Sequence, residues 1–184
     1  MRKILLLVTI FLFGATGAKA IDDPITPDTI RVQEVEISAG QNGVMTLSIF
    51  ADDTTHFNDI TWQGIGSFCI PLRYEKAVMK VDSVKFEGTV AKWDEKFSNT
   101  KMDTGFISLA GIYNLGGADN PPLYLPGEYQ NIASIYFTVL PKAKKGIYGV
   151  ILTHDPIQRE MYCGSTDGFN SWKPVFVPGK IRIK

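Results

Sequence analysis

Apolar residues alternate with less apolar ones at Phe68, Ile70, Leu72 and Tyr74. A period of two is typical of a β-strand that buries one face and turns the other outward. The same kind of short segment, bounded by turn residues, recurs along the chain. It predicts nine strands, at residues 29–37, 44–51, 67–74, 79–86, 105–113, 131–140, 147–153, 172–177 and 180–184.

Turn residues separate these segments, and no convincing amphipathic helix lies among them. The tetrapeptide Gly40-Gln41-Asn42-Gly43 and the tripeptide Val177-Pro178-Gly179 supply the positive or fixed φ angles that turns require. Residues 75–79 are too few for more than a helical turn. The pattern predicts an all-β fold, an antiparallel two-sheet β-sandwich of about nine strands.

The first residues have the features of an export signal. Arg2-Lys3 precedes an apolar run from Ile4 to Phe13, and the small-residue site Ala18-Lys19-Ala20 follows. A membrane-spanning helix needs about 20 apolar residues, and this run is much shorter. We therefore predict a signal peptide at residues 1–20 and one domain at residues 21–184. That domain would be exported to a periplasm or the extracellular space, with no membrane span.

Charge argues against nucleic acid as a partner. The whole chain has 19 basic and 19 acidic residues, and three basic residues lie within the predicted signal peptide. The mature chain therefore keeps 16 basic residues against 19 acidic ones, a net charge of −3. Nucleic-acid binding draws most of its affinity from a basic surface, which this composition lacks.

Three segments resemble the cohesin domain family. Residues 68–84 are similar to the pattern Phe-x-Phe-x-Leu-x-Tyr-Asp-Pro-x-Val-Leu-x-Val, and residues 132–148 are similar to Ile-Ala-x-Ile-x-Phe-x-Val followed by Gly-x-Tyr. Residues 178–183 resemble the family's last strand. The resemblance covers most of residues 32–183. It implies a nine-stranded jelly roll, related to carbohydrate-binding modules, that binds the calcium-loaded dockerin domain of another protein.

The chain departs from the family where many cohesins anchor their partner. Those cohesins carry an Asn and an Asp two residues apart on the outer face of this strand, and the matching positions here are Ser67 and Cys69. Arg73 is the one outward side chain of this strand that can form charge-assisted hydrogen bonds. We therefore expect Ser67, Cys69 and Arg73 to contact a partner, although a solvated surface charge remains the alternative for Arg73.

Aromatic residues provide a second set of candidates. The connection 114–130 is long for a compact domain and holds Tyr124 and Tyr129, so we expect it to be a recognition loop. Trp62, Trp93 and Trp172 could stack on a sugar ring or pack in the core.

Two cysteines remain after the signal peptide, Cys69 and Cys163. Exported proteins mature in oxidising compartments, so a disulfide between these residues is a hypothesis, and two separate thiols are the alternative.

No pattern for catalysis or metal binding stands out. His56 and His154 lie far apart, and neither belongs to a zinc or nucleophile motif. We expect no enzyme activity, no cofactor and no metal. The sequence predicts an exported protein–protein interaction module of cohesin type, within a polysaccharide-degrading or cell-surface assembly. Its partner would be a dockerin-like or other exported protein, and a carbohydrate-binding module that holds a polysaccharide is the alternative.

Overall fold

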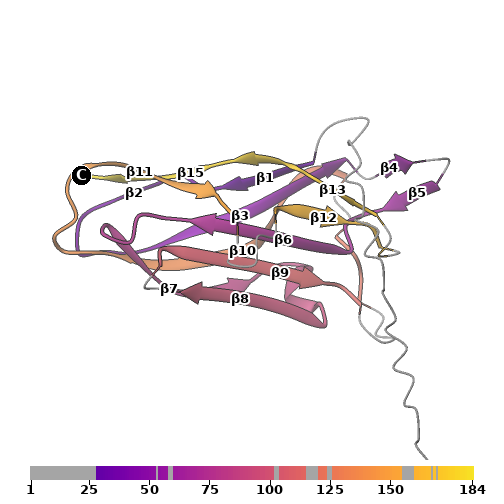
Figure 1. Ribbon diagram of the computed structural model, residues 1–184, viewed down its shortest axis with the longest axis horizontal. Coiled ribbons are helices and arrows are strands. Elements are labelled where there is room, and N and C mark those ends of the chain that lie inside the picture. Colours follow the sequence, from indigo (N-terminus) through magenta and orange to yellow (C-terminus); the bar gives the residue numbers. More distant parts are fainter. Residues whose placement is uncertain are drawn as a thin grey trace, which may run out of the picture.

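The computed structural model describes residues 28–52, 54–57, 60–101, 104–114, 120–123, 126–154, 160–166, 168 and 170–184. The predicted signal peptide lies outside this part of the chain. The described residues form β-strands and one short 3-10 helix, η1 (Val90–Lys92). The strands build two packed sheets, which confirms the predicted β-sandwich (Figure 1).

The first sheet has five strands, and its edge strands are β14 and β7. In spatial order the strands are β14 (Val175–Val177), β1 (Thr29–Val32), β3 (Asn42–Asp52), β10 (Pro126–Val139) and β7 (Met79–Phe86). All neighbours are antiparallel except β1 and β14, which are parallel. Strand β10 is the longest in the described chain and pairs with β3 and β7.

The second sheet has eight strands and is built around β6. Its members are β8 (Glu95–Lys101), β9 (Phe106–Ile112), β6 (Ser67–Arg73), β11 (Gly146–Leu152), β15 (Gly179–Ile183), β2 (Val35–Ile37), β12 (Tyr162–Gly164) and β13 (Ser171–Trp172). A separate hairpin is formed by β4 (Thr54–Phe57) and β5 (Ile60–Gln63). Figure 1 shows this hairpin projecting beyond one end of the sandwich.

One predicted strand is divided between the sheets, and one predicted turn connects the two sheets. The segment predicted at residues 29–37 leaves the first sheet after Val32 and enters the second at Val35. At the other end of the chain, Pro178 separates β14 in the first sheet from β15 in the second. Proline has no N–H to donate to a ladder, so it suits this crossing point. Both crossings join layers, which also explains why β2 and β15 pair in parallel.

The inner faces of the two sheets form one apolar core. The core residues on the strands alternate with residues that point outward. They include Ile30, Met45, Leu47, Ile49, Phe68, Ile70, Leu72, Ile107, Leu109, Ile135, Phe137, Val150 and Ile181. Two tryptophans, Trp93 and Trp172, are also buried in this core. The Trp172 indole N–H donates to Asp28 Oδ2 at 2.8 Å, and the Trp93 indole N–H donates to the Pro121 carbonyl at 3.0 Å. These two rings therefore support the fold and offer no platform for a sugar.

Four strands were not predicted: β4, β5, β8 and β12. The sequence of β8 is Glu-Lys-Phe-Ser-Asn-Thr-Lys, with one apolar residue. As the last strand of its sheet it pairs only with β9 among the described strands. Edge strands need no continuous apolar face, so hydrophobic alternation does not detect them.

Gly179 provides a test of the crossing between the sheets. A Cβ at this buried position would lie 2.8 Å from Val32 Cβ and 3.1 Å from the Gln33 carbonyl. We expect Gly179→Ala to lower the free energy of unfolding by about 1–3 kcal/mol, because β15, which carries Gly179, and β1, which carries Val32, would have to move apart. Urea unfolding followed by circular dichroism measures this change.

The matched control is Gly146→Ala in β11, where the atoms nearest to the new Cβ would belong to the Tyr148 side chain, at 3.4 Å, an ordinary contact. We expect this variant to stay within about 0.5 kcal/mol of the parent. Equal stability of the two variants would show that the close approach of Val32 and Gly179 does not constrain the fold.

Candidate interaction face

Strand β6 has a partner strand on each edge. Strand β9 pairs with it from Ser67 to Arg73, and therefore occupies one edge over its whole length. On the other edge β12 pairs with residues 67–69 and β11 with residues 72–73. Because Phe68, Ile70 and Leu72 point into the core, the alternation turns Ser67, Cys69, Pro71 and Arg73 outward.

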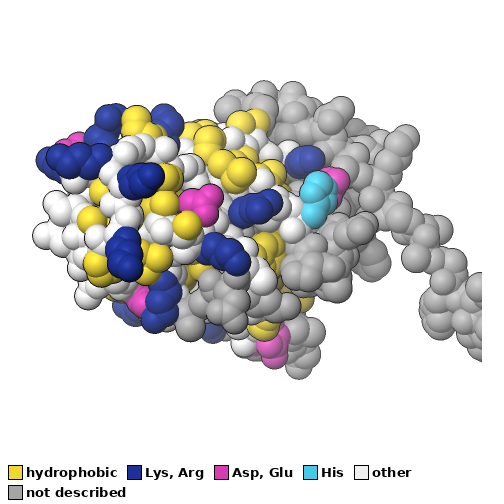
Figure 2. All heavy atoms as spheres, turned by 60° about the vertical axis from the view of Figure 1, so that its left-hand side comes forward, with side chains coloured by type: hydrophobic (Ala, Val, Ile, Leu, Met, Phe, Trp, Pro, Cys, Tyr) yellow, Lys and Arg dark blue, Asp and Glu magenta, His cyan; other side chains and the backbone are white. Residues whose placement is uncertain are grey.

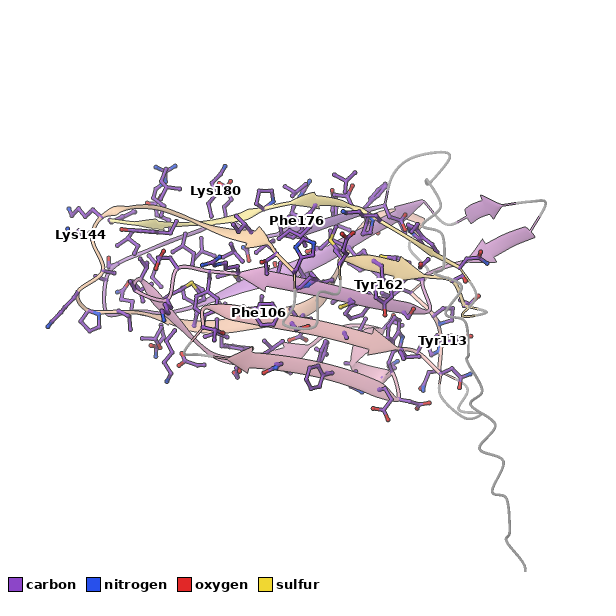
Figure 3. All side chains as sticks on the ribbon, viewed as in Figure 1. Phe106, Tyr113, Lys144, Tyr162, Phe176 and Lys180 are labelled. Atoms are coloured by element: carbon purple, nitrogen blue, oxygen red, sulfur yellow. The ribbon has the colours of Figure 1, made fainter. Side chains whose placement is uncertain are left out.

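This register builds a surface that we call the β6 face, the outward side of β8, β9, β6, β11 and β12. Across the strands, Phe97 lies beside Ala110, Ala110 beside Cys69, and Cys69 beside Tyr162. Ile112 pairs with Ser67, while Arg73 lies between Phe106 and Ile151. Figure 3 labels Phe106 on β9 and Tyr162 on β12, which lie on opposite sides of β6.

Large apolar side chains are exposed around the centre of the β6 face. Phe97 is 53% exposed, Ile112 42% and Ile151 49%. Cys69 and Ser108, which also point outward, are buried. Arg73 is exposed and brings a positive charge to this apolar surface. Figure 2 shows hydrophobic side chains lying among Lys and Arg side chains on one side of the molecule. Grouped exposed apolar residues mark a surface that contacts other molecules.

Charged residues form a small cluster near β12 and β13. Glu160 accepts from Lys173 Nζ at 3.3 Å and lies 3.4 Å from His154 Nε2. The hydrogen bond from Lys173 has the largest effect in lowering the pKa of the Glu160 carboxyl, and the hydrogen bond from His154 has the next largest. This group therefore stays ionised in mildly acidic solution. All three side chains are solvated, so these ion pairs add little to stability.

At the other edge of the same sheet, β15 and β2 carry side chains that form ion pairs. Lys180 Nζ lies 2.8 Å from Glu34 Oε1 and lowers the pKa of that carboxyl, while Glu36 pairs with Lys184 and with Arg182. These opposite charges are paired, and Ile147 on the neighbouring β11 is exposed beside them.

The residues predicted to contact a partner do not lie together. Arg73 is exposed on the β6 face, Ser67 is partly buried there, and Cys69 is 1% exposed. Tyr124 lies outside the described residues. Tyr129 belongs to β10, in the other sheet, so the prediction that it lies in a loop reaching Gln130 is wrong. Strand β10 begins at Pro126 because its backbone continues the pairing with β3 up to Asp52.

The predicted disulfide between Cys69 and Cys163 is wrong. Cys163 lies opposite Phe68 and is buried in the core with it, whereas Cys69 is the next residue along β6 and points to the outer face. The structure has both residues as thiols. Their side chains project from opposite faces of one sheet, an orientation that the short disulfide bridge does not span.

The sequence reasoning did not identify Phe97, Ile112 and Ile151 as members of this face. Ile112 and Ile151 were inside predicted strands, but their outward direction depends on the register with β6. Phe97 lies on the unpredicted β8. A lone aromatic residue within a polar segment was the available signal.

The described residues contain no group of three His, Cys, Asp or Glu side chains placed to hold a metal ion. Within the same residues, no helix is long and apolar enough to cross a membrane.

The fold is shared with solved cohesin structures. A chain of a type I cohesin–dockerin complex from Clostridium thermocellum matches with a TM-score of 0.67 and 17% identity, over 86% of this chain and 100% of that chain. The CaCohA2 solution structure from Clostridium acetobutylicum gives 0.60 and 16%, over 86% and 91%. The non-cellulosomal cohesin from the archaeon Archaeoglobus fulgidus gives 0.58 and 16%, over 86% and 92%. No protein-family model and no curated protein sequence matches this chain.

These likenesses define the class of fold to which the protein belongs. It is a cohesin-like β-sandwich, as the resemblance in the sequence implied. Because the sequence identity is so low, the structural similarity establishes only the fold. An argument about function has to rest on the side chains of the β6 face.

The state of the two cysteines is open to direct test. We expect both thiols to resist alkylation in the folded protein, because Cys69 and Cys163 are buried. Both should react with iodoacetamide after denaturation without any reductant. Peptide mass spectrometry of protein purified from an exported fraction measures this, and a crosslinked Cys69–Cys163 peptide would contradict the structure.

Proposed function

We propose that this protein is a non-catalytic protein-interaction module of cohesin type that binds a dockerin-like domain through the β6 face. The observation that carries the proposal is that one sheet face exposes Phe97 and Ile112 toward one end of β6, and Ile151 beside Arg73 at the other end. Support also comes from solved structures of the same fold, which include cohesin–dockerin complexes.

The chemistry of the face suits a protein partner. Apolar side chains that lose water on contact supply most of the affinity of an interface, and an Arg among them acts as an anchor. Arg73 can form two parallel hydrogen bonds with one carboxylate. The matching surface on the partner should therefore be apolar and carry an acidic side chain opposite Arg73.

The altered anchors narrow the choice of partner. Ser67 is partly buried and Cys69 is buried, so neither offers the amide and carboxylate that many cohesins present at these positions. The partner must therefore depend on apolar contacts with the rim of the face. Calcium would act only through the partner, because the described residues offer no metal site.

The proposal includes export of the protein from the cytoplasm. A signal peptide at residues 1–20 would direct a single domain at residues 21–184 to a periplasm or the extracellular space. A module of this kind could attach an enzyme or surface protein to a polysaccharide-degrading or cell-surface assembly.

Affinity capture tests the partner. Mature protein is immobilised and incubated with the exported fraction of the source organism, with calcium or with a chelator, and retained proteins are identified by mass spectrometry. We expect a protein with duplicated calcium-binding loops to be retained with calcium only. Retention of no such protein under either condition would contradict the proposal.

Variants of the face test the site with the captured partner. We expect Arg73→Ala and Phe97→Ala each to weaken binding by about 2 kcal/mol, roughly 30-fold, since both are exposed side chains that the partner would cover. The matched control is Val44→Ala, because Val44 is a similarly exposed apolar residue on the other sheet. Isothermal titration calorimetry gives the dissociation constants, and equal effects of all three variants would exclude the β6 face.

A further inference from the structure

The outer face of the five-stranded sheet has a different chemistry from the β6 face. Arg31 on β1 lies opposite Ser48 on β3, and Ser48 lies opposite Asn131 on β10. In the next row, Phe50 lies opposite Tyr129. Hydroxyl and amide groups therefore occupy the middle of this surface, which we call the β3 face, with aromatic rings at one side.

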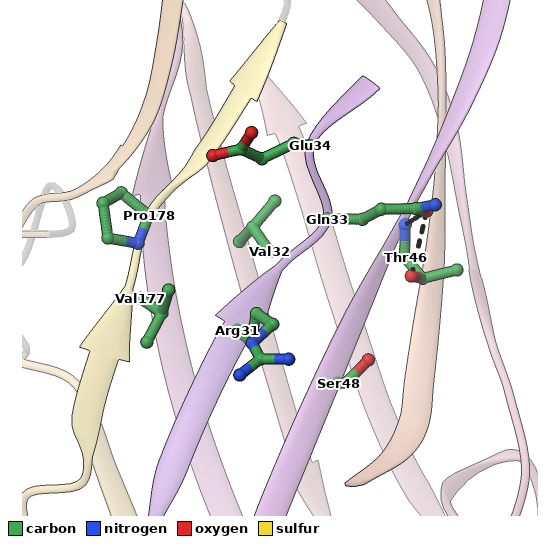
Figure 4. Close-up of a pocket in the computed structure, with 8 residues that line it drawn as sticks. All are labelled: Arg31, Val32, Gln33, Glu34, Thr46, Ser48, Val177 and Pro178. Atoms are coloured by element: carbon green, nitrogen blue, oxygen red, sulfur yellow. Dashed lines mark hydrogen bonds between the residues drawn. The ribbon is translucent and has the colours of Figure 1, made fainter. Parts of the chain in front are cut away.

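Two shallow grooves flank the middle of the β3 face. The first, of about 470 Å³, lies between β1, β3 and the Val177–Pro178 crossing, and Figure 4 shows Arg31 and Ser48 on neighbouring strands beside it. Gln33 Oε1 accepts hydrogen bonds from the backbone N–H and the hydroxyl of Thr46, both at 3.1 Å, which fixes one wall.

The second groove, of about 480 Å³, extends from Asn131 and Tyr129 to Glu87 and Gly88. Between the two grooves the Ser48 hydroxyl donates to Asn131 Oδ1 at 2.7 Å, which orients the Asn131 amide so that its N–H groups remain donors. The grooves therefore adjoin across one hydrogen-bonded pair and form a path over the strands, with polar side chains in its middle and Val177 and Pro178 at one end.

Tyr129 is held in a fixed position beside this path. Its ring is 41% exposed, and the Arg31 guanidinium carbon lies 4.1 Å from the ring centroid. Arg31 Nη2 also donates to the Tyr129 hydroxyl at 3.0 Å, and the Phe50 ring packs against Tyr129 at 5.3 Å. A side chain already fixed by such contacts loses little conformational entropy when a ligand binds.

We propose that the β3 face binds a neutral polysaccharide chain that runs across the strands from Pro178 to Glu87. A sugar ring presents many hydroxyls and one apolar face, which match amide and hydroxyl side chains beside an exposed aromatic ring. From β14 to β7 the path crosses four strand spacings of about 4.8 Å each, about 19 Å in all, so it accommodates several sugar rings.

The charges of the grooves favour a neutral chain over an acidic one. Their lining contains one cation, Arg31, and two acids, Glu34 and Glu87. Both acids already have basic partners, since Glu34 lies 2.8 Å from Lys180 Nζ and Glu87 lies 3.4 Å from Lys85 Nζ. With both pairs neutral, Arg31 leaves a single net positive charge, which is too little to hold a polyanion along the whole path. The proposal does not rest on the dockerin partner, because the two faces belong to opposite sheets.

Native affinity electrophoresis tests this site with the whole mature protein. The gels contain galactomannan, xyloglucan or mixed-linkage β-glucan, with polygalacturonate as the anionic comparison. We expect at least one neutral polysaccharide to retard the protein and polygalacturonate to have no effect. Absence of retardation by all three neutral polymers, or retardation by polygalacturonate alone, would overturn the proposal.

Variants then locate the site. We expect Tyr129→Ala to weaken binding at least tenfold and Asn131→Ala several-fold, while Tyr129→Phe keeps the ring and loses less. Arg73→Ala is the control on the opposite sheet and should leave polysaccharide binding unchanged. Thermal unfolding shows whether each variant is folded. Unchanged retardation of a folded Tyr129→Ala variant would exclude the β3 face, whatever the outcome of the dockerin capture.

Discussion

The pairing register of β6 with β9 is the constraint on which the rest of the structure depends. It places Phe68, Ile70 and Leu72 in the core, and the same alternation places Cys69 and Arg73 on the outside. A slip of one residue would exchange these two sets, exposing the core and burying a guanidinium. Because β8, β11 and β12 are aligned through β6 and β9, this register also brings together exposed residues from segments far apart in the sequence.

The sandwich then presents two chemically distinct surfaces. On the β6 face, exposed Phe97 and Ile151 accompany Arg73, a combination suited to a protein partner. On the β3 face, Asn131 and Ser48 form the middle of a polar path beside Tyr129, a combination suited to a sugar chain. The apolar core separates the two surfaces, so one ligand need not exclude the other. If a dockerin-like domain binds the β6 face and a polysaccharide binds the β3 face, the protein would connect a dockerin-bearing protein to a polysaccharide.

The sequence predicted the sandwich because core strands alternate regularly, and β7 has the bounds that were predicted. The crossing of residues 29–37 between the layers was not predicted, although the alternation changes phase there, from even positions at Ile30 and Val32 to odd positions at Val35 and Ile37. The site was harder to predict. Cys69 and Cys163 looked like a disulfide pair, but only the register shows them on opposite sides of a sheet. Phe97 was missed because the edge strand that carries it lacks an apolar pattern.

The central claim is that the β6 face is the surface that meets a protein partner. Hydroxyl-radical footprinting of the protein, alone and saturated with the captured partner, tests this claim at individual side chains. The account predicts that the partner reduces oxidation of Phe97, Ile112 and Ile151 and leaves that of Tyr129 and Tyr136 unchanged. Protection of the two tyrosines without protection of the three apolar residues would contradict it and move the protein contact to the other sheet.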